Sequence, residues 1–151
     1  MFTLEDIMAM QVNIDGEIMS ADMFFTTGYC DQLAFAISKH VSNSEIIALY
    51  DYLDEDGNSL NDGYLIHSGL YFNNKILDIN GVHDADDWVF EWSELGEEVH
   101  PYYFQDDTCP FKWKSDDIKE ISMKTATQLV RYAEKYLNSK SDQQHSNMLI
   151  Q

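Results

Sequence analysis

The sequence predicts a single α+β domain over residues 1–138, followed by a flexible polar tail over residues 139–151. A length of 151 residues corresponds to one domain, because domains usually contain about 100 to 200 residues. The 44% apolar content, with 8 Phe, 9 Tyr and 3 Trp, suffices to close one core without disulfides or metals. Segments with helical spacing and segments with strand-like composition follow one another along the chain, which indicates a mixed fold.

Apolar side chains recur at helical spacing in three segments. Thr3 is placed to cap a short first helix that contains Ile7, Met8 and Met10. Gly28 permits a sharp turn, and the helix expected after it has an apolar face made of Cys30, Leu33, Ala34, Ile37 and Val41. A last helix is expected over residues 122–137, supported by Met123, Ala126, Leu129, Val130, Ala133 and Leu137.

Residues 45–53 and 64–79 have the β-branched and aromatic composition of strands. In the second stretch, YLIHSGLYF and KILDI flank an Asn-Asn pair, and asparagine tolerates the positive φ of a two-residue hairpin turn. Such a turn pairs Phe72 with Lys75, Leu70 with Leu77, Gly69 with Asp78, and His67 with Asn80. A further strand is expected in WVFEW, residues 88–92, and the aromatic residues between 88 and 103 are expected to cover the sheet.

The charge of the chain is strongly negative and unevenly distributed. Nine basic and 27 acidic residues give a net charge of −18, which would repel nucleic acid and anionic membrane surfaces. Residues 1–111 hold 22 acidic and only two basic residues, a balance of −20. A basic protein or peptide is therefore the expected partner. The expected contact surface follows the hairpin and contains Asp84, Asp86, Asp87, Glu97 and Glu98.

The sequence favours a cytoplasmic protein. Two cysteines, Cys30 and Cys109, are too few for a disulfide framework, and no basic segment precedes an apolar stretch of signal-peptide type. No run approaches the roughly 18 apolar residues of a membrane-spanning helix. No cofactor is expected.

One set of residues has the composition of a catalytic site. A thiol at a helix start is expected to have a lowered pKa, because unpaired N–H groups and the helix dipole stabilise its anion, and Cys30 has this position. On the predicted hairpin, His67, Asp78 and Asn80 share one face, so either of the latter two can orient the imidazole of His67. Gly69 leaves room between them.

This arrangement resembles the papain-like and transglutaminase-like cysteine enzymes over residues 28–81. In that superfamily a Cys opens a helix packed on an antiparallel sheet, a His begins a later strand, and an Asp or Asn on the next strand orients the His. The stretches GYCDQLAFAI, LIHSGLYF and KILDINGVH match this order. The resemblance implies Cys30 as nucleophile, His67 as base and Asp78 as orienting residue.

Two residues near Cys30 differ from the papain pattern. Phe24 stands where a papain-type enzyme has the Gln that binds the oxyanion, so backbone N–H groups near Cys30 are expected to serve instead. Asp31 opposes a thiolate at Cys30, so activation is expected to depend on His67. The implied activity is cysteine-dependent acyl transfer, as in a peptidase, a deamidase or an acyltransferase.

Other interpretations remain open at the level of sequence. Cys30 alone is also typical of a small buried apolar residue, and Cys109 lies in a loop with no helix behind it. A metal site using His67, His83 and Asp78 or Asp86 lacks a tight two-histidine spacing. The alternative function is a non-catalytic acidic inhibitor or immunity-type protein that binds a basic partner such as a nuclease, or a mimic of nucleic acid.

Overall fold

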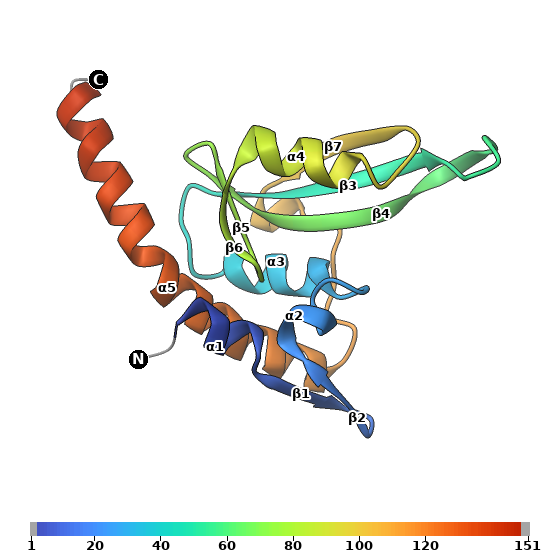
Figure 1. The fold of residues 1–151 in the computed structure, drawn as a ribbon, viewed down its shortest axis with the longest axis horizontal. Coiled ribbons are helices and arrows are strands. Elements are labelled where there is room, and N and C mark those ends of the chain that lie inside the picture. The colour runs from blue at the N-terminus through green and yellow to red at the C-terminus, as the bar shows by residue number, and fades with distance from the viewer. Residues whose placement is uncertain (1–2, 149–151) are drawn as a thin grey trace.

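Five antiparallel strands form the central sheet in the spatial order β6-β5-β4-β3-β7 (Figure 1). The computed structural model describes residues 3–148 and confirms a single-domain α+β fold with a C-terminal helix. A separate two-stranded hairpin, β1–β2, turns at Asp15 and Gly16, both with positive φ. The elements in chain order are α1 (Leu4–Met8), β1 (Gln11–Ile14), β2 (Glu17–Ser20), α2 (Ala21–Phe24), α3 (Cys30–Ser38), β3 (Glu45–Leu53), β4 (Ser59–Phe72), β5 (Lys75–Asp78), β6 (Gly81–Asp84), α4 (Ala85–Ser93), β7 (Val99–Phe104), η1 (Asp106–Thr108) and α5 (Asp116–Met148).

Helices cover both faces of the sheet (Figure 1). On one face, α3 packs between the sheet and α5, and the resulting core includes Ile37, Leu70 and Leu129, all fully buried. On the other face lies α4, where Trp88 packs against Ile47 and Leu49 of β3. Because side chains alternate along a strand, β3 supplies both cores from neighbouring positions.

The β4–β5 hairpin has the predicted turn. Asn73 and Asn74 have φ values of 46° and 61°, as a two-residue turn of this kind requires. Phe72 pairs with Lys75, and Leu70 pairs with Leu77, which confirms the predicted register up to that point. The strand β4 is longer than predicted, because it begins at Ser59 rather than near residue 64.

The strand predicted over residues 88–92 is wrong, because this segment belongs to α4. Asp84 caps the helix by accepting hydrogen bonds from the backbone N–H groups of Asp86 and Asp87. The apolar residues of α4 also follow a helical period, at Ala85, Trp88, Val89 and Trp92. The prediction that the aromatic residues of this stretch cover the sheet holds for Trp88, which is 1% exposed, and for Trp92 beside it. It fails for Phe90, which is 66% exposed, and for Tyr102 and Tyr103, which belong to β7.

The C-terminal helix α5 is longer than the predicted 122–137 at both ends. It begins at Asp116, where the Ser115 hydroxyl accepts a hydrogen bond from the Ile118 N–H. It ends at Met148 and therefore includes most of the segment predicted as a polar tail; residues 149–151 lie outside the described residues. Across the part of the chain that the structure describes, no helix is long and apolar enough to cross a membrane.

Candidate functional site

Cys30 is the first residue of α3 and lies against β4. Gly28 has a φ of 124°, a conformation that favours glycine, and Tyr29 then leads into the helix. The backbone N–H of Ser68 faces the Cys30 sulfur, so the thiol lies beside the residue that follows His67. The pairing of β4 with β5 covers only Leu70 to Phe72, so the backbone of Ser68 has no β5 partner.

The thiol of Cys30 is protonated in this environment. Two effects together raise its pKa from 9.0 to about 12: burial, which is the larger, and the negative charge of the neighbouring Asp31 carboxylate. The N–H groups of Ser68, Asp31 and Cys30 lower the pKa but do not compensate. The lowered pKa predicted from the helix-start position is therefore wrong, because Cys30 is only 5% exposed.

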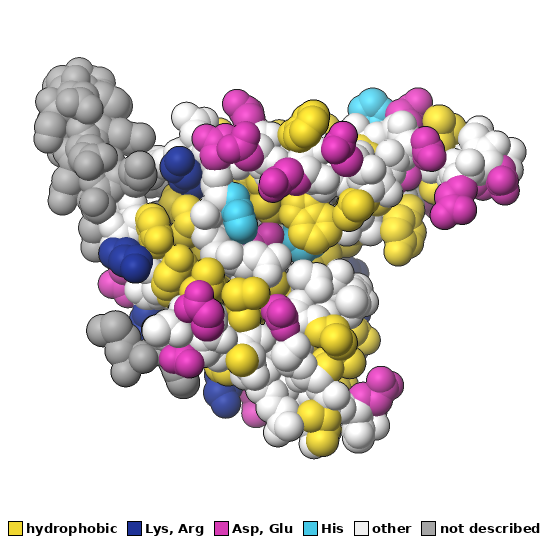
Figure 2. All heavy atoms as spheres, viewed as in Figure 1, with side chains coloured by type: hydrophobic (Ala, Val, Ile, Leu, Met, Phe, Trp, Pro, Cys, Tyr) yellow, Lys and Arg dark blue, Asp and Glu magenta, His cyan; other side chains and the backbone are white. Residues whose placement is uncertain are grey.

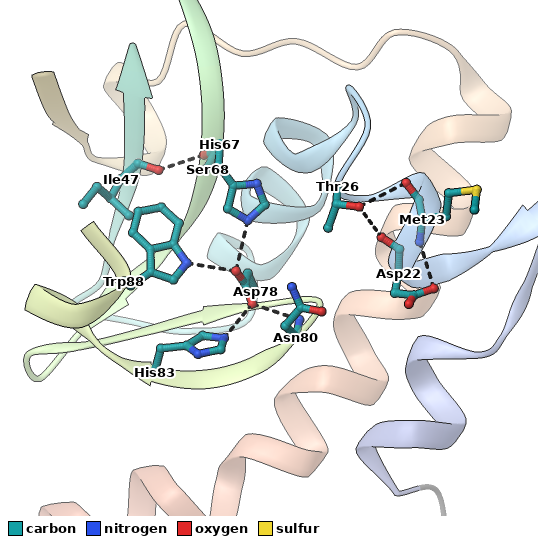
Figure 3. Close-up of polar contacts among 10 residues, drawn as sticks. All are labelled: Asp22, Met23, Thr26, Ile47, His67, Ser68, Asp78, Asn80, His83 and Trp88. Atoms are coloured by element: carbon teal, nitrogen blue, oxygen red, sulfur yellow. Dashed lines mark hydrogen bonds and ion pairs between the residues drawn. The ribbon is translucent and has the colours of Figure 1, made fainter. Parts of the chain in front are cut away.

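His67 and Asp78 form a buried pair on the α4 face of the sheet (Figure 3). The His67 Nε2 lies 3.0 Å from Asp78 Oδ2, and the two residues are 0% and 3% exposed. The Trp92 ring stacks on the imidazole with 3.7 Å between ring centroids, which fixes the ring plane. The hairpin therefore brings together the His and the Asp that the sequence placed on one face.

Asp78 is held as a carboxylate by four hydrogen-bond donors. Its Oδ2 accepts from His67 and from the Trp88 Nε1–H at 2.9 Å, and its Oδ1 accepts from the Asn80 N–H at 2.9 Å and from His83 Nε2 at 3.0 Å. Burial raises the pKa of Asp78, but the hydrogen bonds and charges of His67 and His83 outweigh it and lower the pKa well below 3.8. Asp78 is thus ionised throughout the neutral range.

The carboxylate fixes the orientation of the His67 ring. Because an ionised Asp78 can only accept, Nε2 of His67 donates a proton to it. Nδ1 is buried and has no hydrogen-bond partner among the described residues. In Figure 3 this nitrogen is on the side of the ring turned away from Asp78. A buried imidazole nitrogen without a partner is uncommon and marks His67 as a candidate functional residue.

Asn80 does not lie opposite His67, contrary to the sequence analysis. It lies in the turn between β5 and β6, where Asp78 pairs with Gly81, and His67 instead pairs with Leu49 of β3. Asn80 contacts Asp78 through its backbone N–H, so it supports the carboxylate and does not orient the imidazole. The chain reverses at this point through Gly81, whose φ is 108°.

His83, which the sequence suggested only for a metal site, is a further member of this cluster. It projects from β6 onto the second oxygen of Asp78 and is 30% exposed on its side chain. The hydrogen bond that His83 donates to the Asp78 carboxylate raises the pKa of His83. A signal was present in the sequence, since a turn at INGV places His83 beside β5 with Asp78 at the end of that strand.

A pocket of about 290 Å³ opens next to this cluster on the α4 side. Its walls include Asp78, His83, Trp88, Glu91 and Trp92. In Figure 2, a histidine is visible at the bottom of a hollow between the α4 layer and the helical layer. Asp78 and His83 therefore both line this pocket.

The five predicted partner-binding acids are all exposed, at the two ends of α4. Asp84, Asp86 and Asp87 form the start of the helix, where Asp84 is also its cap. Glu97 and Glu98 follow its other end. Their backbone N–H groups donate hydrogen bonds to the Asp51 carboxylate, which holds this loop against β3. Acidic side chains extend along this layer in Figure 2.

Within the described residues, no group of three or more His, Cys, Asp or Glu side chains is arranged to hold a metal ion. The pairs His67–Asp78 and His83–Asp78 are instead direct hydrogen bonds. A comparison with protein-family models finds no match to this chain, and comparisons with curated proteins and solved structures find none either.

Proposed function

We propose that this protein is a cysteine-dependent acyl-transfer enzyme, of the papain-like or transglutaminase-like kind, acting on a basic protein or peptide. One observation carries the proposal: among the described residues the buried Nδ1 of His67 has no hydrogen-bond partner, while Nε2 is held by an ionised Asp78. A structural histidine in a core usually satisfies both of its nitrogens. Cys30 lies against the same stretch of β4, with its sulfur facing the Ser68 N–H.

In the proposed reaction, the thiol and imidazole act together. In the resting structure the Cys30 thiol makes no hydrogen bond with His67 Nδ1, so this reaction requires the two groups to come within reach when substrate binds. Nδ1 would then accept the thiol proton as the sulfur attacks the substrate carbonyl carbon, and Asp78 would stabilise the imidazolium that forms. Collapse of the tetrahedral intermediate breaks the bond to the leaving amine or alcohol, which takes the proton from His67. Water or an amine then releases the acyl group from the thioester and regenerates the thiol.

The raised pKa of Cys30 determines the form of catalysis. A thiol with a pKa of about 12 is almost fully protonated at neutral pH. The proton must therefore leave during attack, as in serine hydrolases, rather than beforehand in a stable thiolate–imidazolium pair. The N–H groups of Cys30, Asp31 and Ser68, which already face the sulfur, are the available donors for the developing oxyanion.

The first test is to locate a covalent label. When the protein is treated with a peptide-like acyl electrophile that carries a Lys or Arg side chain, it is expected to gain one adduct at Cys30 and none at Cys109. Intact mass followed by peptide mapping measures this outcome. Cys109→Ser should keep full labelling and Cys30→Ser should lose it. Equal labelling of both thiols, or labelling unaffected by Cys30→Ser, would contradict the proposal.

A second candidate, the acidic binding protein, is favoured by the exposed acids at both ends of α4. Neutralising Asp84, Asp86, Asp87, Glu97 and Glu98 as Asn or Gln should slow association with a basic protein, and raised salt should reduce the same rate in the wild type. Surface plasmon resonance against a basic protein such as a cationic nuclease measures both effects. An association rate indifferent to salt and to the five replacements would assign these acids to solubility alone. Under this candidate Cys30→Ser would retain the whole biological effect.

A further inference from the structure

A segment far along the chain lies across the turn that carries Cys30. Residues 112–114, between η1 and α5, are bound to α3 through the side-chain amide of Gln32, whose nitrogen and oxygen both make hydrogen bonds to their backbone. Gln32 donates from Nε2 to the Lys112 carbonyl at 2.9 Å, and its Oε1 accepts from the Lys114 N–H at 2.9 Å. Gln32 is 0% exposed, so this segment forms part of the cover over the start of α3.

The ammonium group of Lys114 reaches back into the same turn. It donates to the Gly28 carbonyl at 2.9 Å and lies 4.8 Å from the centre of the Tyr29 ring, a cation–π distance. It also lies 3.8 Å from Asp31 Oδ1, which is ion-pair range but too long for a hydrogen bond. Gly28, Tyr29 and Asp31, which flank Cys30, therefore supply a carbonyl, an aromatic face and a carboxylate to one cation.

The carboxylate of Asp31 is incompletely satisfied. Its Oδ2 accepts from Gln32 Nε2 at 3.2 Å, but its Oδ1 is buried and has no hydrogen-bond partner among the described residues. The residue is 6% exposed, and a buried carboxylate oxygen without a donor is costly. The unpaired Oδ1 of Asp31 is therefore a position at which a hydrogen-bond donor of a ligand could bind.

We propose that the Gly28 carbonyl, the Tyr29 ring and the Asp31 carboxylate form a cation subsite beside Cys30, which Lys114 fills in the resting chain. A Lys or Arg side chain of the substrate displaces Lys114 and places the neighbouring carbonyl at the Cys30 thiol. This inference rests on the proposed function and specifies its substrate class, since the cation is recognised at the nucleophile itself. Lys114 remains half-exposed, with 46% of its side chain accessible, so it can leave without unfolding the core.

The test compares two thiol reagents that differ in charge. In a Cys109→Ser background, Cys30 is modified by 2-aminoethyl or by 2-sulfonatoethyl methanethiosulfonate; the thiolate bonds to the thio sulfur and methanesulfinate leaves. The same thiolate fraction multiplies both rates, so the ratio of cationic to anionic rates reports only charge recognition. Lys114→Met, which keeps the apolar stem, should raise this ratio roughly tenfold at about 0.15 M salt, where long-range charge effects are screened.

Three comparisons decide the result. Lys119→Met should leave the ratio unchanged, because its ammonium lies over Trp113 rather than in the Cys30 turn. Adding Asp31→Asn to Lys114→Met should abolish the gain, with thermal unfolding showing that the double variant is folded. A ratio unchanged by Lys114→Met, or raised equally by Lys119→Met, would overturn the subsite. The ratio does not require His67, so loss of the proposed chemistry and loss of the subsite are distinguishable.

Discussion

Replacing His67 with alanine is expected to lower the rate of Cys30 acylation by an activated ester about 100-fold to 10,000-fold, the usual contribution of a general base. The reason is that the Cys30 thiol is protonated at neutral pH, so attack requires an acceptor for its proton. Within the described structure, His67 Nδ1 is a buried imidazole nitrogen with no hydrogen-bond partner, which makes it the candidate acceptor. Release of p-nitrophenolate in the first turnover, compared across pH, measures this rate.

His83→Ala provides the matched control, because His83 contacts the same Asp78 through the other oxygen. This variant should retain most of the acylation rate, since its imidazole supports the carboxylate without replacing His67. Circular dichroism and thermal unfolding establish that both variants are folded. If His83→Ala were as damaging as His67→Ala, the general base would be misassigned. If neither variant mattered, the cluster would serve only the core.

The second large effect is expected on stability at Asp78. In Asp78→Asn, an amide NH₂ replaces one carboxylate oxygen and faces two hydrogen-bond donors. These donors lose their acceptor, so the free energy of unfolding is expected to fall by about 3 kcal/mol or more. The pH dependence follows from the lowered pKa of Asp78. Its contribution is complete above the unfolded value of about 3.8 and is lost as the pH falls through the lower folded pKa.

Guanidinium unfolding at pH 7 and at successively lower pH below 4 measures this difference. The gap in unfolding free energy between wild type and Asp78→Asn should narrow as the pH falls in that range. Asp62→Asn, an exposed acid on β4, should show no comparable gap at any pH. A gap that stayed constant down to the lowest pH would mean that the charge of Asp78 is not what stabilises the fold.

The sequence predicted those parts of the fold that depend on local chemistry. The Asn73-Asn74 pair determined the turn and hence the register of β4 and β5, because few residues accept a positive φ. The alternation of side chains then placed His67 and Asp78 on one face. The α4 segment was misassigned because WVFEW is short and apolar, and the helical period is visible only when Ala85 is included.

The electrostatic state of the site could not be predicted in the same way. The pKa of Cys30 depends on burial by α3, β4 and the chain around it, which a helix-start argument does not include. The position of Asn80 depends on where β5 ends. Counting residue pairs outward from the Asn73-Asn74 turn predicts a partner for Asn80 on β4, but β5 ends at Asp78 and Asn80 lies in the next turn. Lys114 lies 86 residues after Gly28 in sequence, so only the tertiary structure brings its ammonium to the Cys30 turn.

The burial of the Cys30 thiol also affects how readily oxidants such as peroxide react with it. Peroxide reacts with thiolates that solvent can reach, and sulfinic or sulfonic acid at a catalytic cysteine is in most cases irreversible. Cys30 is buried, and its pKa of about 12 leaves very little thiolate, so the resting protein offers peroxide a poor target. The burial of Cys30 is therefore expected to keep the thiol in its reduced form when the protein meets oxidants.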